Sequence, residues 1–216
     1  MYTNKDAMLE TSSQELVQSL LSRPNAPIIL SEVEEKLAAE QKKRVAFYDE
    51  VTDEQKVEFI NGEVIVHSPV KKEHNDVSGR LFKLLDTYVK KHKLGYVGIE
   101  KVMIALSRNN YEPGICFFGQ EKSRKFKKDQ SLFPPPDFVV EVLSKGTTKN
   151  DRGIKFDDYQ AHLVKEYWII DPKEGSVEQY RLNPKSNYVR TAIKSQSRNH
   201  RMPVGSRIHS SNRSYF

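Results

Sequence analysis

The stretch at residues 134–172, PPPDFVVEVLSKGTTKNDRGIKFDDYQAHLVKEYWIIDP, decides the predicted fold. Three prolines lead into residues 137–143, an apolar run that is typical of a buried strand. Helical spacing follows over about residues 150–163, and the apolar run 166–170 predicts a second strand. A helix between two strands favours a mixed sheet with helices packed against it.

The flanking sequence adds a hairpin, helices and further strands. Residues 56–60 and 63–68 are β-prone runs separated by Asn61-Gly62, the pair favoured in a type I′ turn. Helices are predicted at 14–22, from an N-cap at Ser31 to about Tyr48, and at 73–94 with Gly95 as the C-cap. Further strands are predicted at 96–106, 115–118, 177–182 and 188–194, and a charged loop at 119–133. The predicted class is α/β (α+β), a single domain with a central mixed sheet flanked by helices.

The positive charge of the chain is unevenly distributed. The 216 residues carry 35 basic and 29 acidic side chains, a net charge of +6. Residues 181–216 hold eight Lys or Arg and no Asp or Glu, which leaves 27 basic and 29 acidic side chains in residues 1–180, a net charge of −2. The basic excess therefore lies in the tail, and global charge is a poor argument for a nucleic-acid partner.

Length and composition set the expected class of protein. The chain is long enough for one hydrophobic core, and a single Cys cannot form an intrachain disulfide. The start lacks the charged-then-apolar order of a signal peptide, and no apolar run approaches the ~18 residues of a membrane span. We therefore expect a soluble cytoplasmic protein with no membrane partner. The expected division is a polar segment with a short helix at 1–27, a domain at 28–194 and a basic, unstructured tail at 195–216.

Glu141 is the first candidate functional residue, because it lies inside the apolar run FVVEVL. Alternation places Asp137, Val139, Glu141 and Leu143 on one face of the strand. A carboxylate there must be paired, bound to a metal ion or shifted in its pKa. A plain salt bridge or a strand-end position explains Glu141 equally well.

Lys155 and Glu63 are weaker candidates when each is taken alone. Asp151, Lys155, Tyr159 and His162 share one face of the predicted helix, and the simplest interpretation is a surface ion pair between Asp151 and Lys155. Glu63 directly follows the Asn61-Gly62 turn, where a solvated side chain is the ordinary expectation.

Several common kinds of site have no sequence support. His67 and His74 have no partner at metal-ligand spacing, which argues against a zinc site. The ten glycines form no phosphate-binding loop pattern, and no Gly-x-Ser-x-Gly motif is present.

Taken together, VEFINGEVIVHSP at 57–69 and the stretch 134–172 resemble the PD-(D/E)xK nuclease superfamily. The resemblance is to its bacterial branch, described as "putative restriction endonuclease" proteins, and it covers roughly residues 51–182. It implies a restriction-endonuclease-like fold over the domain at 28–194. It also implies a hydrolase that cuts DNA phosphodiester bonds, with Mg²⁺ or Mn²⁺ held by acidic side chains.

The resemblance assigns a role to each candidate. Glu63 matches an early acidic position and Glu141 the strand carboxylate, so these two side chains are the implied metal ligands. Lys155 matches the helix-borne lysine that positions or activates the attacking water, because Leu143 occupies the usual lysine position. Paired cuts in the superfamily imply a homodimer.

The sequence departs from the family pattern at an expected metal ligand, at Leu163, where the family commonly has Gly, and at the end of the chain. The segment Tyr111-Glu112-Pro113-Gly114-Ile115 has Gly114 where the family ordinarily has an Asp that binds the metal. Mg²⁺ typically takes one or two protein carboxylates, so this loss is expected to weaken the site severely. The tail after about residue 194 also lacks the family's apolar segments, as an altered or frameshifted terminus would.

Two function classes follow from the resemblance. One is a metal-dependent endodeoxyribonuclease impaired by Gly114, and the other is a catalytically inactive nuclease-fold protein with a nucleic-acid-binding or assembly role. A plain interaction module, in which Glu141 and Lys155 affect only stability, is a third interpretation. The KSRKFKKD run is the densest basic cluster of the body, and a solvated loop is its simplest interpretation. Its candidate phosphate contacts are Lys122, Arg124, Lys125, Lys127 and Lys128.

Overall fold

The computed structural model describes residues 13–52 and 54–195. The chain divides into two compact units. The described part of the first comprises residues 13–52, 54–67 and 107–111, and that of the second comprises residues 68–106 and 112–195. Each unit is described by itself.

The first unit contains two helices and a small antiparallel sheet. Its elements are α1 (Ser13–Leu21), α2 (Ala26–Glu50), β1 (Val57–Ile60), β2 (Glu63–Val66) and β5 (Asn110–Tyr111). The predicted hairpin is confirmed, with β1 paired to β2 around Asn61 and Gly62, whose φ angles of 51° and 82° suit a type I′ turn. The side chain of Arg44 joins α2 to β5, because its Nε donates to Asn110 Oδ1 at 2.6 Å.

The start predicted for α2 was wrong. The helix begins at Ala26, so Ser31 lies within its second turn rather than at the N-cap. Pro27 is in the first turn, where a proline removes no intrahelical hydrogen bond and its fixed φ suits the helix.

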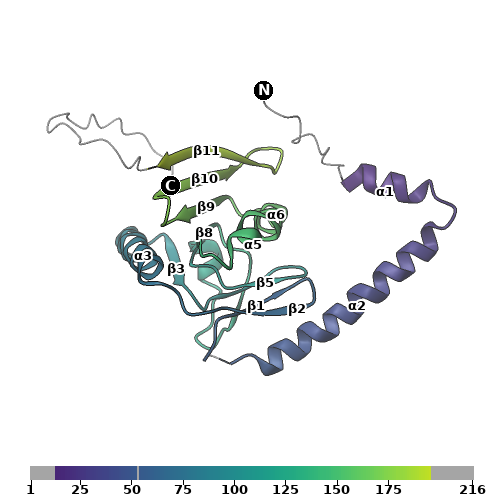
Figure 1. Ribbon diagram of the computed structural model, residues 1–216, viewed down its shortest axis with the longest axis horizontal. Coiled ribbons are helices and arrows are strands. Elements are labelled where there is room, and N and C mark those ends of the chain that lie inside the picture. The colour runs from purple at the N-terminus through teal and green to yellow at the C-terminus, as the bar shows by residue number, and fades with distance from the viewer. Residues whose placement is uncertain (1–12, 53, 196–216) are drawn as a thin grey trace. The chain divides into compact units, whose positions relative to one another are not determined.

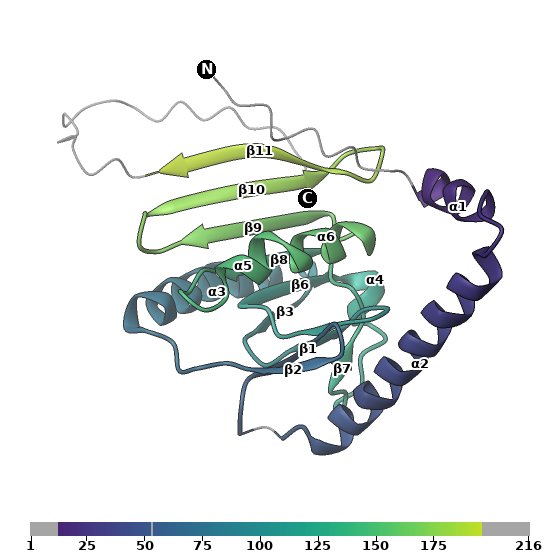
Figure 2. The ribbon, with the colours of Figure 1, turned by 45° about the vertical axis from the view of Figure 1, so that its right-hand side comes forward.

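The second unit is built on a six-stranded mixed sheet in the order β11-β10-β9-β8-β6-β3 (Figures 1 and 2). The strands β8 and β9 are parallel, and their other neighbours pair antiparallel. The six strands are β3 (Gly95–Ile99), β6 (Ile115–Gly119), β8 (Phe138–Val142), β9 (Glu166–Asp171), β10 (Ser176–Leu182) and β11 (Tyr188–Ser195). A short parallel pair, β4 (Met103–Ala105) with β7 (Leu132–Phe133), belongs to the same unit.

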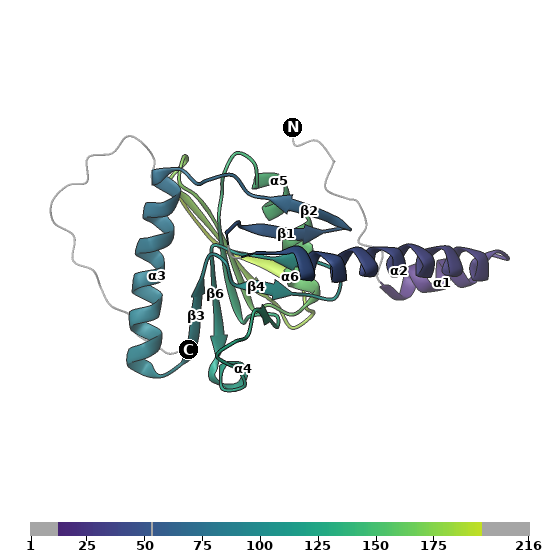
Figure 3. The ribbon, with the colours of Figure 1, turned by 90° about the horizontal axis from the view of Figure 1, so that it is seen from below.

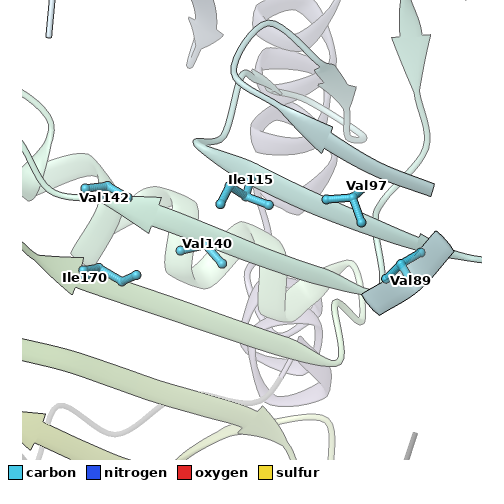
Figure 4. Close-up of a cluster of buried hydrophobic side chains, with 6 residues drawn as sticks. All are labelled: Val89, Val97, Ile115, Val140, Val142 and Ile170. Carbon is cyan, nitrogen blue, oxygen red and sulfur yellow. The ribbon is translucent and has the colours of Figure 1, made fainter. Parts of the chain in front are cut away.

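Helices cover both faces of the six-stranded sheet, as Figure 3 shows. The helix α3 (Lys72–His92) lies against one face, and α5 (Thr148–Arg152) and α6 (Ile154–Ala161) lie on the other. Side chains of α3 pack on a buried cluster of Val89, Val97, Ile115, Val140, Val142 and Ile170 (Figure 4). The predicted mixed-sheet α+β class is therefore confirmed.

Three predicted elements of this unit differ in detail. The α3 helix ends with Lys93 in the left-handed conformation at its C-cap, while Gly95 belongs to β3. The strand predicted at 96–106 is interrupted at Glu100, which has a φ of 53°, and the predicted loop 119–133 contains α4 (Gln120–Ser123) and β7. The helix predicted at 150–163 is broken at Gly153.

The tail predicted to be unstructured, 195–216, lies outside the described residues except for Ser195 at the end of β11. Among the described residues, no helix has the length and apolar character needed to cross a membrane.

Candidate functional site

Glu141 lies on the face of the six-stranded sheet that carries α5 and α6. Its neighbours Val140 and Val142 belong to the buried cluster beneath α3, so alternation turns Glu141 to the opposite face. The residue is only 5% exposed. Because a charged carboxylate is costly to bury alone, its partners decide the chemistry of the site.

Lys155 is the principal partner of Glu141. Its Nζ lies 3.2 Å from Glu141 Oε1 and 3.1 Å from Asp151 Oδ1. The Lys155 and Asp151 side chains are 2% and 1% exposed. The expected ion pair between Asp151 and Lys155 is present, but its predicted surface location was wrong, because one ammonium group bridges two carboxylates in a buried network. Glu141 is salt-bridged, which was one of the two kinds of explanation left open by the sequence.

Two tyrosines complete this network. The Tyr159 hydroxyl donates to Glu141 Oε1 at 3.4 Å, and the Tyr167 hydroxyl donates to the backbone oxygen of Asp151 at 2.8 Å. Tyr159 lies one turn beyond Lys155 on α6, and Tyr167 lies on β9. The helical segment is thus fixed over the strand that carries Glu141.

Gly114 lies beside Glu141 at the start of β6. Ile115 pairs with Val140, so the antiparallel register brings Gly114 opposite Glu141. The Gly114 N–H donates to Glu141 Oε2 at 3.4 Å. A Cβ at this position would lie 3.2 Å from the backbone oxygen of Val140, a tight contact that requires Val140 to shift by a few tenths of an ångström. A side chain at position 114 would share the sheet face of Glu141.

The described residues do not fit a divalent metal ion as they stand. Both Glu141 oxygens accept hydrogen bonds from the chain itself, and Asp151 is paired with Lys155. Within residues 13–52 and 54–195, no group of three or more His, Cys, Asp or Glu side chains is arranged to hold a metal. Mg²⁺ requires near-octahedral oxygen coordination, and these side chains do not offer such a set of oxygens. The Mg²⁺ or Mn²⁺ cofactor therefore stays a prediction.

Glu63 belongs to the first unit rather than to the unit of Glu141 and Lys155. It is the first residue of β2, pairs across the hairpin with Ile60, and is exposed. Its assignment as a metal ligand stays a prediction. Of the three predicted catalytic residues, the second unit brings Glu141 and Lys155 together.

The predicted basic cluster is mostly open to solvent. Arg124, Lys125, Lys127 and Lys128 are exposed. Lys122 is engaged within the unit, because its Nζ lies 3.2 Å from Asp137 Oδ1 and donates to Pro135 O at 2.8 Å. These contacts make Lys122 a less available phosphate contact than the other four.

Asp137 lies at the opposite end of β8 from Glu141. Burial raises the pKa of its carboxyl, but hydrogen bonds from the Gly119 N–H and from Lys165, with the charge of Lys122, hold that pKa below its usual value. Asp137 is thus a structural anion, and the same lysine side chains that stabilise it tie β8 to the segments around it.

Asp151 and Tyr159 are contacts of the site that were not assigned a functional role from the sequence. The signal was available, because Asp151, Lys155 and Tyr159 recur at four-residue spacing. What the spacing could not show is that this face is buried against Glu141.

Comparisons with known proteins identify the family of the chain. The family model Uma2, described as "Putative restriction endonuclease", matches residues 42–206. The "Uncharacterized protein sll1609" of Synechocystis sp. (strain ATCC 27184 / PCC 6803 / Kazusa) is 28% identical over 130 residues, covering 58% of this chain and 72% of the relative.

The fold is also similar to a solved structure. This is the crystal structure of "a putative nuclease belonging to DUF820" from Anabaena variabilis ATCC 29413. Its TM-score is 0.58 at 19% sequence identity, and the match covers 67% of this chain and 80% of that one. The likeness supports the restriction-endonuclease-like fold.

Proposed function

The chain belongs to the Uma2 family of "putative restriction endonucleases", and from that premise we propose that it acts on DNA as an endonuclease whose metal-dependent hydrolysis is impaired by Gly114. The substrate class follows from the family. The observation that carries the impairment is the position of Gly114, which lies opposite Glu141 with no side-chain oxygen to offer. Glu141 and Lys155 are the proposed catalytic residues, and Glu63 is a further proposed ligand.

The network around Glu141 also supports a slow enzyme. Lys155 Nζ is already shared between Glu141 and Asp151, so a phosphodiester oxygen would compete with two carboxylates for its charge. Those carboxylates are buried, so leaving either without its cation is costly. The positive charge of Lys155 is therefore already neutralised by Glu141 and Asp151, and a phosphodiester must compete with these two carboxylates for it.

The test is nicking of a supercoiled plasmid in Mg²⁺ and in Mn²⁺. We expect the Gly114→Asp variant to cleave at least tenfold faster than the natural chain, because a carboxylate returns to the face of Glu141. Adding Glu141→Gln is expected to remove the gain. The matched control is Gly146→Asp, since Gly146 is exposed and a Cβ there meets nothing within 4 Å.

Two outcomes would overturn the proposal. If the natural chain cleaves as fast as Gly114→Asp, position 114 does not limit hydrolysis. If Gly114→Asp folds, as its circular dichroism shows, but is inactive with both metals, this is not the hydrolytic site.

A second candidate function is binding without cleavage. Its specific support is the set of four exposed cations at 124–128, which are suited to phosphate contacts whether or not Glu141 is active. Retained DNA affinity in the Glu141→Gln variant, with no cleavage by the natural chain, would favour this function. For the endonuclease we also propose a homodimer on DNA, which light scattering with and without duplex tests.

A further inference from the structure

One end of the second unit combines aromatic rings with exposed cations. Tyr96 on β3 and Phe118 on β6 pair across the sheet, with ring centroids 6.2 Å apart. Phe126 and Phe133 pack against both rings. We define the aromatic–basic patch by its partly or fully exposed members, Tyr96, Arg124, Lys125, Phe126, Lys127 and Phe133.

Of the cations of this patch, Arg124 is held by a hydrogen bond to α4, and Lys125 and Lys127 flank the Phe126 ring in sequence. The Gln120 side-chain amide donates to the backbone oxygen of Lys93, and Arg124 Nη2 donates to Gln120 Oε1 at 3.1 Å. These bonds attach α4 to the end of α3, directly before β3 (Figure 3). Residues 120–128 carry five basic side chains and one acidic one, so the local charge is strongly positive.

Tyr96 offers an accessible ring rather than a buried one. It is 41% exposed, and its ring is nearly parallel to that of Phe133, at an interplanar angle of 9°. Held from behind by other rings, it does not have to be immobilised on binding. An exposed aromatic ring beside lysines and arginines is the arrangement that binds unpaired nucleobases while the cations hold the phosphates.

The patch shares a sheet face with Glu141. Phe118 and Gly114 alternate to the same face of β6, and Gly114 is opposite Glu141. From Gly114 to Gly119, the last residue of β6 and the N-cap of α4, the chain advances by five residues, or about 17 Å. At a helical rise of about 3.4 Å per nucleotide, that length corresponds to about five nucleotides.

We propose that the aromatic–basic patch binds a single-stranded segment of the DNA substrate, with an unpaired base on Tyr96 and phosphates on the cations of residues 124–127. The inference rests on the proposed function only in naming DNA as the ligand. Intact duplex keeps its bases stacked on one another, so the Tyr96 ring contributes to binding only where a base is unpaired.

The first experiment measures fluorescence anisotropy of a labelled oligothymidylate with the full chain. Tyr96→Leu is expected to weaken binding roughly tenfold, within the range for loss of one base–aromatic stack, and Tyr96→Phe is expected to bind like the natural chain. The control is Tyr88→Leu, because Tyr88 is similarly exposed at 43% but lies on α3, across the sheet.

The second experiment measures the salt dependence of the same affinity. The variant Lys125→Gln/Lys127→Gln is expected to lower the slope of log affinity against log salt by about 1.4, the value for two phosphate contacts on a single strand. The control is Arg80→Gln/Lys83→Gln, which removes the same charge from exposed positions of α3 and is expected to leave the slope unchanged.

The proposal is overturned if Tyr96→Leu binds the oligonucleotide as the natural chain does, or if either control has an equal effect. It is also overturned if Tyr96→Leu weakens binding to a hairpin duplex as much as to the single strand. Failure of this proposal is distinguishable from failure of the proposed function. Binding of the oligonucleotide tests the patch, whereas plasmid cleavage by Gly114→Asp tests the endonuclease.

Discussion

Replacing Lys155 by Met is expected to lower the free energy of unfolding by about 4 kcal/mol. Lys155 Nζ lies 3.1 Å from Asp151 and 3.2 Å from Glu141, in a site that solvent barely reaches. At an effective dielectric constant of about 20, each contact contributes roughly 5 kcal/mol of gross attraction. Desolvation of the lysine offsets much of this, and removing one partner of a buried ion pair typically costs about 3–5 kcal/mol.

Urea unfolding followed by fluorescence of Trp168 measures this loss. Trp168 is the single tryptophan and lies on β9 opposite Val140 of β8, packed against the cluster beneath α3, so its fluorescence reports unfolding of the second unit. Lys83→Met is the control, because Lys83 is exposed on α3, and it is expected to change stability by less than about 0.5 kcal/mol.

A double-mutant cycle tests the cause of the loss. Glu141→Gln/Lys155→Met is expected to cost less than the sum of its single changes by about 1–3 kcal/mol, because the double variant no longer leaves that carboxylate charged beside an apolar side chain. A loss below about 1 kcal/mol for Lys155→Met, or additive single changes, would refute the buried network.

Three further predictions concern the scaffold. Gly95→Ala is expected to destabilise the chain by more than about 2 kcal/mol in urea, because its Cβ would lie 1.9 Å from Phe118 O at a φ of +150°; a neutral change would contradict the β3–β6 pairing. The Arg152 hydrogen bond lowers the pKa of Glu178, so this stabilisation is present above the unfolded value of 4.5 and is lost as pH falls through the folded one. Arg152→Ala should therefore cost about 1 kcal/mol in neutral buffer and little in acid, and an equal loss at both would exclude the pair. Burial raises the pKa of the Cys116 thiol, so iodoacetamide should modify the native chain far more slowly than the urea-unfolded chain; equal rates would show that the thiol is open.

The sequence predicted those features whose cause is local. Asn61-Gly62 specified the hairpin because both residues tolerate positive φ. Alternation along residues 137–143 placed Glu141 on the face opposite the α3 core, and helical spacing aligned Lys155 with Asp151. These local rules placed Glu141 on a strand and Lys155 on the helix that follows it, whereas their proposed catalytic roles came from the family resemblance.

Features that depend on tertiary context could not be predicted in this way. Burial of the Asp151–Lys155 pair depends on Glu141, which lies on another element. The break at Gly153 separates α5 from α6, yet Asp151 and Lys155 stay aligned across it. The periodic pattern is therefore the same as that of one continuous helix, and the sequence could not reveal the break. The aromatic–basic patch likewise joins residues from β3, the segment after α4, and β7, which are distant in the sequence.

The backbone at position 114 has an evolutionary consequence. Gly114 has no positive φ, so its backbone conformation does not require glycine, but a Cβ there would need the backbone oxygen of Val140 to move by a few tenths of an ångström. Aspartate codons differ from certain glycine codons by a single nucleotide. Where the codon is one of these, one point mutation would place a carboxylate on the strand face of Glu141, and the cost to the sheet would be the shift that Val140 must make.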